Sequence, residues 1–344
     1  MKQLLLLIGF GLTIGYHTTA QNYHAVQGSS YAGSLGVHNN PASIVNTPFK
    51  WDLTVFGVQA QTSTNAVTIY DYSFLSSPAN SKYYFTGGDY ARYAKVNVNL
   101  NLFNTRIALG RRQAISFGVN FRSYTNLSTS RYNFIDTLKT TGQFFAMNPA
   151  NTNLGLAMTT SSWAELYGTY SRTLFDEELG RLNAGVTVKL SRGLSGAYAQ
   201  LDGGRFTADI QGNQGYIVSD GRLVYGYSSN FDEWKKGAPN STNLNNFLAY
   251  TQGGASFDLG FEYLVKTQEV TNIFDDDNYY DYKWKLGVAL LDIGGNQYKY
   301  GTQSRVVNGV KANITNLSLD HKFDSTVNSL RVFNDSLATL VSQS

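Results

Sequence analysis

The chain has 344 residues and a mass of 38.0 kDa, with 27 Lys and Arg against 24 Asp and Glu. This even balance of charge excludes the basic surface typical of nucleic-acid binding. The absence of cysteine excludes disulfides, zinc–cysteine sites and thiol catalysis. A mean hydropathy of −0.25 excludes a helical membrane protein. The remaining composition is poor in charge, at 15%, and rich in aromatic residues, at 14%.

The first twenty residues have the pattern of a secretory signal peptide. Lys2 precedes an apolar run, Leu4 to Leu12, that is too short to span a bilayer. Small residues at Thr18 and Ala20 predict cleavage before Gln21, and the alternative is a buried N-terminal helix. No later apolar run reaches helix-spanning length. A membrane-embedded mature chain would therefore have to cross with strands, since only helices and closed barrels satisfy every backbone group in lipid.

Alternation of apolar and polar residues predicts many β-strands. In the clearest segment, Val96, Val98 and Leu100 alternate with Asn97 and Asn99, so one face is apolar and the other carries amides. The clear segments are 95–103, 115–122, 183–191, 257–265 and 284–290. Weaker candidates are 50–60, 66–74, 104–110, 163–174, 205–211 and 221–228. We expect tight turns at 110–113 and 176–180, and longer polar connections at 126–160, 229–252 and 267–281.

Two architectures produce such strands: a soluble sandwich with the apolar face inside, and a membrane barrel with the apolar face on lipid. The polar face is rich in Asn, Ser, Thr and Gly rather than Lys and Glu, and Tyr and Phe cluster near strand ends. We therefore predict an all-β fold, an antiparallel transmembrane β-barrel of about 12–14 strands. Lumen-lining residues would be Asn97, Asn99, Asn101, Asn120 and Arg122.

The chain divides into a signal peptide (1–20), an N-terminal plug-like segment or hatch (21–48), the barrel (49–312) and a helical tail (313–344). In the tail, Asp324 and Ser325 would cap an amphipathic helix. Its apolar residues, spaced by three and four, would be Val327, Leu330, Phe333, Leu337, Leu340 and Val341. Barrels usually end in an aromatic-terminated strand, so this ending is also consistent with truncation before further strands.

The sequence contains no catalytic or metal-binding pattern. His17, His24, His38 and His321 form no close-spaced set, and no phosphate-binding loop or nucleophile elbow is present. The acidic run Asp275–Asp277 is best interpreted as a solvated loop rather than a calcium site. We expect no enzymatic activity, no metal and no cofactor. Arg106, Arg111, Arg112 and Arg122 would either attract anions into a lumen or serve as interface and turn residues.

Several short motifs resemble known outer-membrane barrels. Asn40-Pro41-Ala42 resembles an element near the mature N-terminus of long-chain fatty-acid transporter-like barrels. The order of further stretches resembles an uncharacterised family of outer-membrane barrels from Bacteroidota: 50–53, 163–165, 183–189, 193–198 and 286–294. The resemblance implies a barrel of about fourteen strands with an N-terminal segment inside. It also implies that Asn40, Pro41 and Ala42 form a hatch, the alternative being a turn that only caps the periplasmic mouth.

Three functions follow as hypotheses. The first is an outer-membrane barrel that passively transports small hydrophobic molecules, with membrane lipid as its surroundings. The second is a structural or accessory barrel that binds envelope or secretion proteins. The third is a secreted soluble β-protein that binds glycans through tyrosine-rich surfaces.

Overall fold

The computed structural model describes residues 28–70, 82–149, 152–209, 215–235, 237–266, 280–327 and 329–343. The predicted signal peptide and the acidic run Asp275–Asp277 lie outside these residues. No helix in the described part of the chain is both long and apolar enough to cross a membrane.

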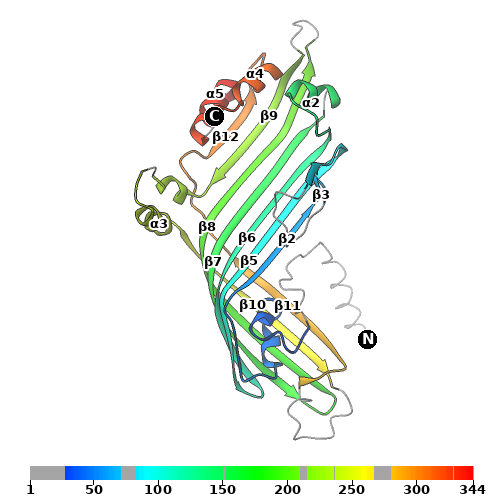
Figure 1. Cartoon of the computed structure of the whole chain (residues 1–344), viewed down its shortest axis with the longest axis vertical. Helices are drawn as coiled ribbons and strands as arrows, with labels where there is room; N and C mark the ends of the chain where they lie inside the picture. Colours follow the sequence, from blue (N-terminus) through cyan, green and yellow to red (C-terminus); the bar gives the residue numbers. More distant parts are fainter. Residues whose placement is uncertain are drawn as a thin grey trace.

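One large antiparallel sheet dominates the structure, so the predicted all-β class is confirmed (Figure 1). Its strands are β1 (Trp51–Thr54), β2 (Gly57–Thr64), β5 (Gly88–Gly110), β6 (Gln113–Phe134), β7 (Leu154–Asp176), β8 (Gly180–Ala208), β9 (Tyr216–Tyr227), β10 (Gln252–Val265), β11 (Trp284–Gly295), β12 (Arg305–Val310) and β13 (Val341–Gln343). A separate hairpin joins β3 (Val67–Tyr70) to β4 (Lys82–Phe85).

Short helices lie before β1 and in the connections between the strands. The α-helices are α2 (Thr141–Met147), α3 (Asn240–Ala249), α4 (Asn316–Lys322) and α5 (Leu330–Leu340), and the 3-10 helices are η2 (Gly33–His38), η3 (Pro41–Val45) and η5 (Ser229–Glu233). Figure 1 shows α2, α4 and α5 near the upper end of the long strands and α3 at mid-height. η2 and η3, drawn in blue, lie against the lower half.

The strands are arranged in long rows. β10 and β9 follow one another along the same side of β8, β10 on residues 180–193 and β9 on residues 197–208. The next position in the sheet is likewise shared by two strands placed end to end, since β11 pairs with β10 and β12 pairs with β9. At the opposite edge of the sheet, β1 and β2 lie end to end and both pair with β5.

The sheet is not closed into a barrel. Within the described residues, β11 pairs only with β10, while β1 and β2 pair only with β5. Every pairing from β1 through β5, β6, β7, β8 and β10 to β11 is antiparallel, so the edge strands β1 and β11 run in the same direction. Direct pairing of the two edges would therefore be parallel.

The central strands are longer than predicted. β6 has 22 residues and β7 has 23, so much of the expected polar connection at 126–160 is strand instead. Polar residues there obscured the alternation, but long-range backbone pairing with β5 and β8 continues through them. The tight turns are confirmed, because β5 ends at Gly110 and β6 begins at Gln113, and β7 ends at Asp176 before β8 begins at Gly180.

The polarity of the lower sheet is the reverse of that in a soluble sandwich. Along β7, Glu165, Thr169 and Ser171 are buried, whereas Leu166 and Tyr170 between them are exposed. β8 repeats the pattern, with Thr187 and Lys189 buried and Val186, Val188 and Leu190 exposed. The buried polar face is the one on which η3 packs, since η3 contacts β7, β8 and β10.

The sheet is strongly curved around this polar face. Arg122 on β6 and Asp292 on β11 form an ion pair of 2.7 Å, although β7, β8 and β10 lie between their strands. In a flat sheet those strands would be about 19 Å apart, given a spacing of about 4.8 Å. Side chains of Arg and Asp cannot bridge that gap, so curvature must bring the strands together.

The C-terminal helix begins later than predicted. Ser329, rather than Asp324 or Ser325, caps α5 by accepting a hydrogen bond from the Val332 backbone N–H. Asp324 instead accepts hydrogen bonds from Thr326 in a local turn. This competition explains the shift, because Asp side chains bind nearby backbone N–H groups in turns as readily as at helix starts. Val341, expected in the helix, begins β13.

Candidate functional site

The concave polar face is occupied by residues 33–46, which we call the plug. Its Ser34 N–H donates to Asp52 Oδ1 at 2.7 Å on the edge strand β1. Asn40 Nδ2 donates to the Phe261 carbonyl at 2.9 Å on β10, close to the other edge. The plug therefore connects strands that lie far apart in the order of the sheet, as Figure 1 shows for the blue segment.

Asn40, Pro41 and Ala42 form a compact turn at the centre of the plug. Asn40 is extended, and its Oδ1 accepts from the Ala42 N–H at 2.9 Å, while Pro41 supplies the first residue of η3. Two glycines that are paired in register, Gly185 on β8 and Gly260 on β10, face this turn. A Cβ at either position would overlap the turn, with Pro41 C only 2.5 Å from one on Gly185. The predicted turn thus lies directly on the wall of the sheet.

A buried arginine ties the plug to β5. Arg106 is 1% exposed, and its Nε and Nη1 donate to the carbonyls of Ile44 at 2.5 Å and Phe49 at 2.6 Å. Asp52 lies 3.8 Å from the same guanidinium and compensates its charge. Because this charged donor satisfies carbonyls of η3 and of the segment that follows it, removing it would leave these acceptors without their donor.

A cluster of charged side chains, which we call the charge cluster, lies on the polar wall beside the plug. Its members are Arg122 on β6, Glu165 on β7, Lys189 on β8, Asp258 on β10 and Asp292 on β11. Arg122 binds Asp292 through both of its terminal nitrogens, at 2.7 and 2.9 Å. Lys189 Nζ lies 2.7 Å from both Asp258 Oδ2 and Asp292 Oδ1. These pairs compensate charges that the curved sheet removes from water.

Asp292 reaches the charge cluster because of a β-bulge. The register between β10 and β11 shifts between Phe257 and Leu259, and Asp292 adopts a left-handed φ of 57° there. Its N–H donates to Asp258 Oδ1 at 2.7 Å. Strict alternation from Leu290 would point Asp292 outward, so the bulge redirects this carboxylate toward the interior.

The structure brings most of the predicted lumen residues together. Asn99, Asn101, Asn120 and Arg122 are 1–5% exposed on the polar face, and Asn97 is partly buried there. Asn99 Oδ1 accepts from Arg122 Nε at 3.3 Å, and Asn120 Nδ2 donates to Glu165 Oε1 at 3.2 Å. These amides therefore extend the charge cluster along β5 and β6.

The four arginines considered together in the sequence separate into two groups. Arg106 and Arg122 are buried on the polar face, where they contact the plug and the charge cluster. Arg111 and Arg112 are exposed in the turn between β5 and β6. A single anion-attracting set is therefore not present.

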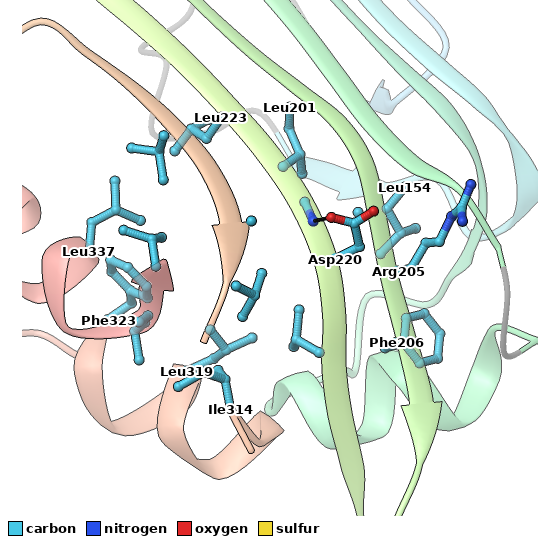
Figure 2. Close-up of a pocket in the computed structure, with 18 of the residues that line it drawn as sticks. Leu154, Leu201, Arg205, Phe206, Asp220, Leu223, Ile314, Leu319, Phe323 and Leu337 are labelled. Atoms are coloured by element: carbon cyan, nitrogen blue, oxygen red, sulfur yellow. Dashed lines mark hydrogen bonds between the residues drawn. The ribbon is translucent and has the colours of Figure 1, made fainter. Parts of the chain in front are cut away.

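An apolar cavity of about 340 Å³ lies away from the plug, at the upper end of the sheet. Leu201, Leu223 and Val307 line it from β8, β9 and β12, and Leu337 covers it from α5. Figure 2 shows Leu319, Phe323 and Leu337 on the helical side facing Leu154 and Phe206 across the strands. Its lining is almost entirely aliphatic and aromatic.

The family is identified by comparison with known sequences. A family model described as a family of unknown function, DUF5723, matches residues 41–343. The chain belongs to this family. No curated protein and no solved structure matches the chain. The expected membership of an uncharacterised family is thus confirmed, whereas the likeness to fatty-acid transporters receives no support.

Several residues of the site were not identified from the sequence. Lys189 and Asp258 lie on the polar faces of two segments with alternating polarity. Their opposite charges were a signal that could have suggested that they pair. Glu165 had the same signal. Asp292 had none, because a bulge decides its direction. Arg106 was named, but its role at the plug depends on carbonyls more than fifty residues away in the sequence.

Replacement of Arg106 by Met should release the plug. The variant R106M retains much of the side-chain volume but leaves the Ile44 and Phe49 carbonyls without a charged donor. We therefore expect the free energy of unfolding to fall by about 2–4 kcal/mol. Urea unfolding would measure the loss, and limited proteolysis would detect cleavage within residues 33–46. The matched control is R172M, at an exposed position on β7. Equal protease resistance of R106M and wild type would contradict the assignment.

Acidification should weaken the packing of the plug through His38. This imidazole packs edge-on against Tyr167 with ring centroids 5.4 Å apart. Burial, together with the positive charges of Lys189 and Arg122 and against the opposing effect of Asp292, lowers the pKa of His38 to about 3. The unfolded chain, with a pKa near 6.5, binds more protons between these values. Stability should therefore fall as pH drops below about 6.5, by at most about 1.4 kcal/mol per pH unit.

The measurement is the urea midpoint at pH 7 and pH 5 for wild type and H38Q. The variant should lose part of the pH dependence, because Gln does not titrate. H321Q is the control at an exposed histidine. If H38Q and wild type show the same slope, the buried imidazole does not contribute the effect.

Proposed function

We propose that the chain is an integral β-protein of the outer membrane, with lipid against its exposed apolar face and the plug filling its polar interior. The observation that carries the proposal is the reversed polarity of the sheet. Val188 and Leu190 on β8 and Leu166 on β7 are 56–60% exposed, whereas Lys189 and Glu165 between them are at most 5% exposed. Membrane barrels place apolar side chains outward and polar side chains inward in this way.

Water would not favour this arrangement. A sheet in water gains free energy by burying its apolar face, at roughly 25 cal/mol per Å². Here ionised groups are buried instead, and long apolar ladders such as Leu286, Val288 and Leu290 on β11 are 59–62% exposed. Contiguous apolar patches of this kind mark a membrane or protein contact. The predicted signal peptide is consistent with export to such a membrane.

Closure into a barrel is part of the proposal. Because the edge strands β1 and β11 run in the same direction, one strand antiparallel to both would close the sheet with antiparallel pairing throughout. The pairing of β13 with β12 supports such a row, because it is antiparallel and lies on the side of β12 away from β9. Its register runs from Val310 to Asn308 of β12, toward the side on which β11 lies. Bacterial barrels normally have an even number of strands, which this closure would satisfy.

The plug is a stopper in this proposal. It is held by Arg106, by the Gly185 and Gly260 wall and by Asn40, and the surrounding wall is polar and ion-paired. Passive transport of small hydrophobic molecules through this interior would require the plug to move aside. The apolar cavity favours a hydrophobic small molecule at a different place, on the sheet face outside the interior. Envelope or secretion partners remain the second candidate role.

A charge placed on the lipid-facing side tests the membrane assignment. V188R puts an arginine at an exposed position in the middle of the segment of β8 that pairs with β10, and it should destabilise the protein by about 2–4 kcal/mol in a bilayer. L179R is the control, because Leu179 is equally exposed, at 63%, but lies in the turn between β7 and β8. The measurements are carbonate extraction of membranes and gel mobility of boiled and unboiled samples. A V188R protein as stable as L179R, or ready solubility without detergent, would overturn the proposal.

Adjacent prolines on β11 test barrel closure. Successive N–H groups of a strand point to opposite sides, so one of Val288 and Ala289 donates toward β10 and the other toward the edge. If a closing strand is present, V288P and A289P should each lose a ladder hydrogen bond and destabilise by about 3 kcal/mol. The readout is the temperature at which each variant, purified from outer membranes, loses its unboiled mobility. Destabilisation by only one of the two would show an unpaired edge.

A further inference from the structure

The apolar cavity lies on the same face of the sheet as the exposed apolar side chains. Leu201 of β8 is paired in register with Leu156 of β7 and with Leu223 of β9, so these three side chains share a face. β7 pairs with β6 without interruption from Leu156 to Arg172, so its side chains alternate regularly. Leu156 and Leu166, ten residues apart by number, therefore point to the same side. The cavity is thus continuous with the face that we propose to contact lipid.

In the part of the chain that the structure describes, α4 and α5 cover this face at its upper end. Phe333 and Leu337 of α5 and Phe323 beside α4 pack against Tyr225 and Val307 of the strands. The C-terminal end of α5 is held by the Lys311 N–H, which donates to the Leu340 carbonyl at 2.9 Å. The packing is incomplete, because about 340 Å³ remains between the helices and the strands. That volume lies within the range of roughly 300–1,000 Å³ of small-molecule sites.

The chemistry of the cavity fits a hydrocarbon. Its polar residues, Arg205 and Asp220, lie on neighbouring strands and are already engaged: Arg205 Nε donates to Asn153 Oδ1 at 3.1 Å, and Asp220 Oδ1 accepts from the Gly221 N–H at 2.8 Å. The remaining lining offers a water molecule no set of polar partners, and apolar cavities of this kind stay dry and take up apolar guests. An occupant would be recognised by shape and apolar contact alone.

We propose that this cavity binds one hydrocarbon chain of a membrane lipid, which enters from the apolar face and packs between α5 and strands β8, β9 and β12. The source of the chain rests on the proposed function, since a lipid reaches the cavity only if that face adjoins the bilayer. The site itself depends only on the cavity. Its position is separate from the plug and the charge cluster, so it would be occupied while the interior is closed.

Gly221 offers a way to fill the cavity without strain. It lies on β9 in the cavity lining, and a Cβ built there meets no atom closer than 3.9 Å. The variant G221L would therefore project an isobutyl group into the space that the hydrocarbon occupies. G168L is the matched control, because Gly168 lies exposed on the same face of β7 and a Cβ there meets nothing within 4 Å.

The experiment measures binding of dodecanol to delipidated full-length protein by native mass spectrometry, in detergent or in buffer according to where the protein is soluble. Wild type and G168L should each bind one dodecanol, and G221L should bind it at least tenfold more weakly. V310F, which fills the same space from the neighbouring strand β12, should repeat the loss and guards against misfolding of G221L. Circular dichroism, which does not depend on the membrane assignment, confirms that each variant is folded.

Equal binding by G221L, V310F and wild type would overturn the proposal, as would the absence of a one-to-one complex in wild type. Lipid retained by protein extracted from membranes provides the second measurement. Wild type and G168L should carry one co-purifying lipid that G221L lacks. If the protein proves soluble but still binds dodecanol in this pattern, the membrane assignment fails while the cavity assignment stands.

Discussion

The structure depends on pairing the charged side chains that are buried on the concave polar face of the sheet. Arg122, Lys189 and Arg106 are each at most 5% exposed, and a buried unpaired charge would be costly. Curvature of the sheet brings Asp292 of β11 to Arg122 of β6, and the plug brings carbonyls to Arg106. Both the curvature of the sheet and the plug therefore supply partners for buried charges. The curvature supplies Asp292 to Arg122, and the plug supplies the Ile44 carbonyl to Arg106.

The plug and the curvature are also coupled geometrically. Ser34 binds Asp52 at one edge and Asn40 binds the Phe261 carbonyl near the other, so the plug fits only a sheet of this curvature. Gly185 and Gly260 allow the backbone of the plug to approach the wall closely enough for these bonds to form. A segment that is attached at so many points is better suited to a fixed position than to repeated opening. Movement of the plug would have to break several buried interactions together.

The two faces of the sheet divide the chemistry of the protein. The polar face holds charges, amides and the plug, and it offers little to a hydrophobic molecule. The opposite face is apolar along the lower strands, where it is exposed, and near the cavity, where α4 and α5 cover it. Between these two regions it carries the hydroxyl pairs Ser123–Ser162 and Thr125–Thr160. The hydrocarbon that we propose for the cavity would therefore lie on this apolar face, apart from the plug. This separation makes lipid binding and interior transport distinguishable by experiment.

The sequence by itself determined the strands with clear alternation, their two faces and the turns at 110–113 and 176–180, because alternation and turn chemistry are local properties. It did not predict β4, β12 or β13. It also determined the Asn40-Pro41-Ala42 turn, which is closed by a hydrogen bond between residues two apart. The tertiary structure decided the length of the strands through 126–160, since pairing with neighbouring strands continues where alternation fades. It also decided that Asp292 points inward and that Arg106 holds the plug, and within the described residues it leaves β1 and β11 each paired on one side. Bulge position, curvature and edge pairing arise from contacts between distant segments, and no local pattern of residues encodes them.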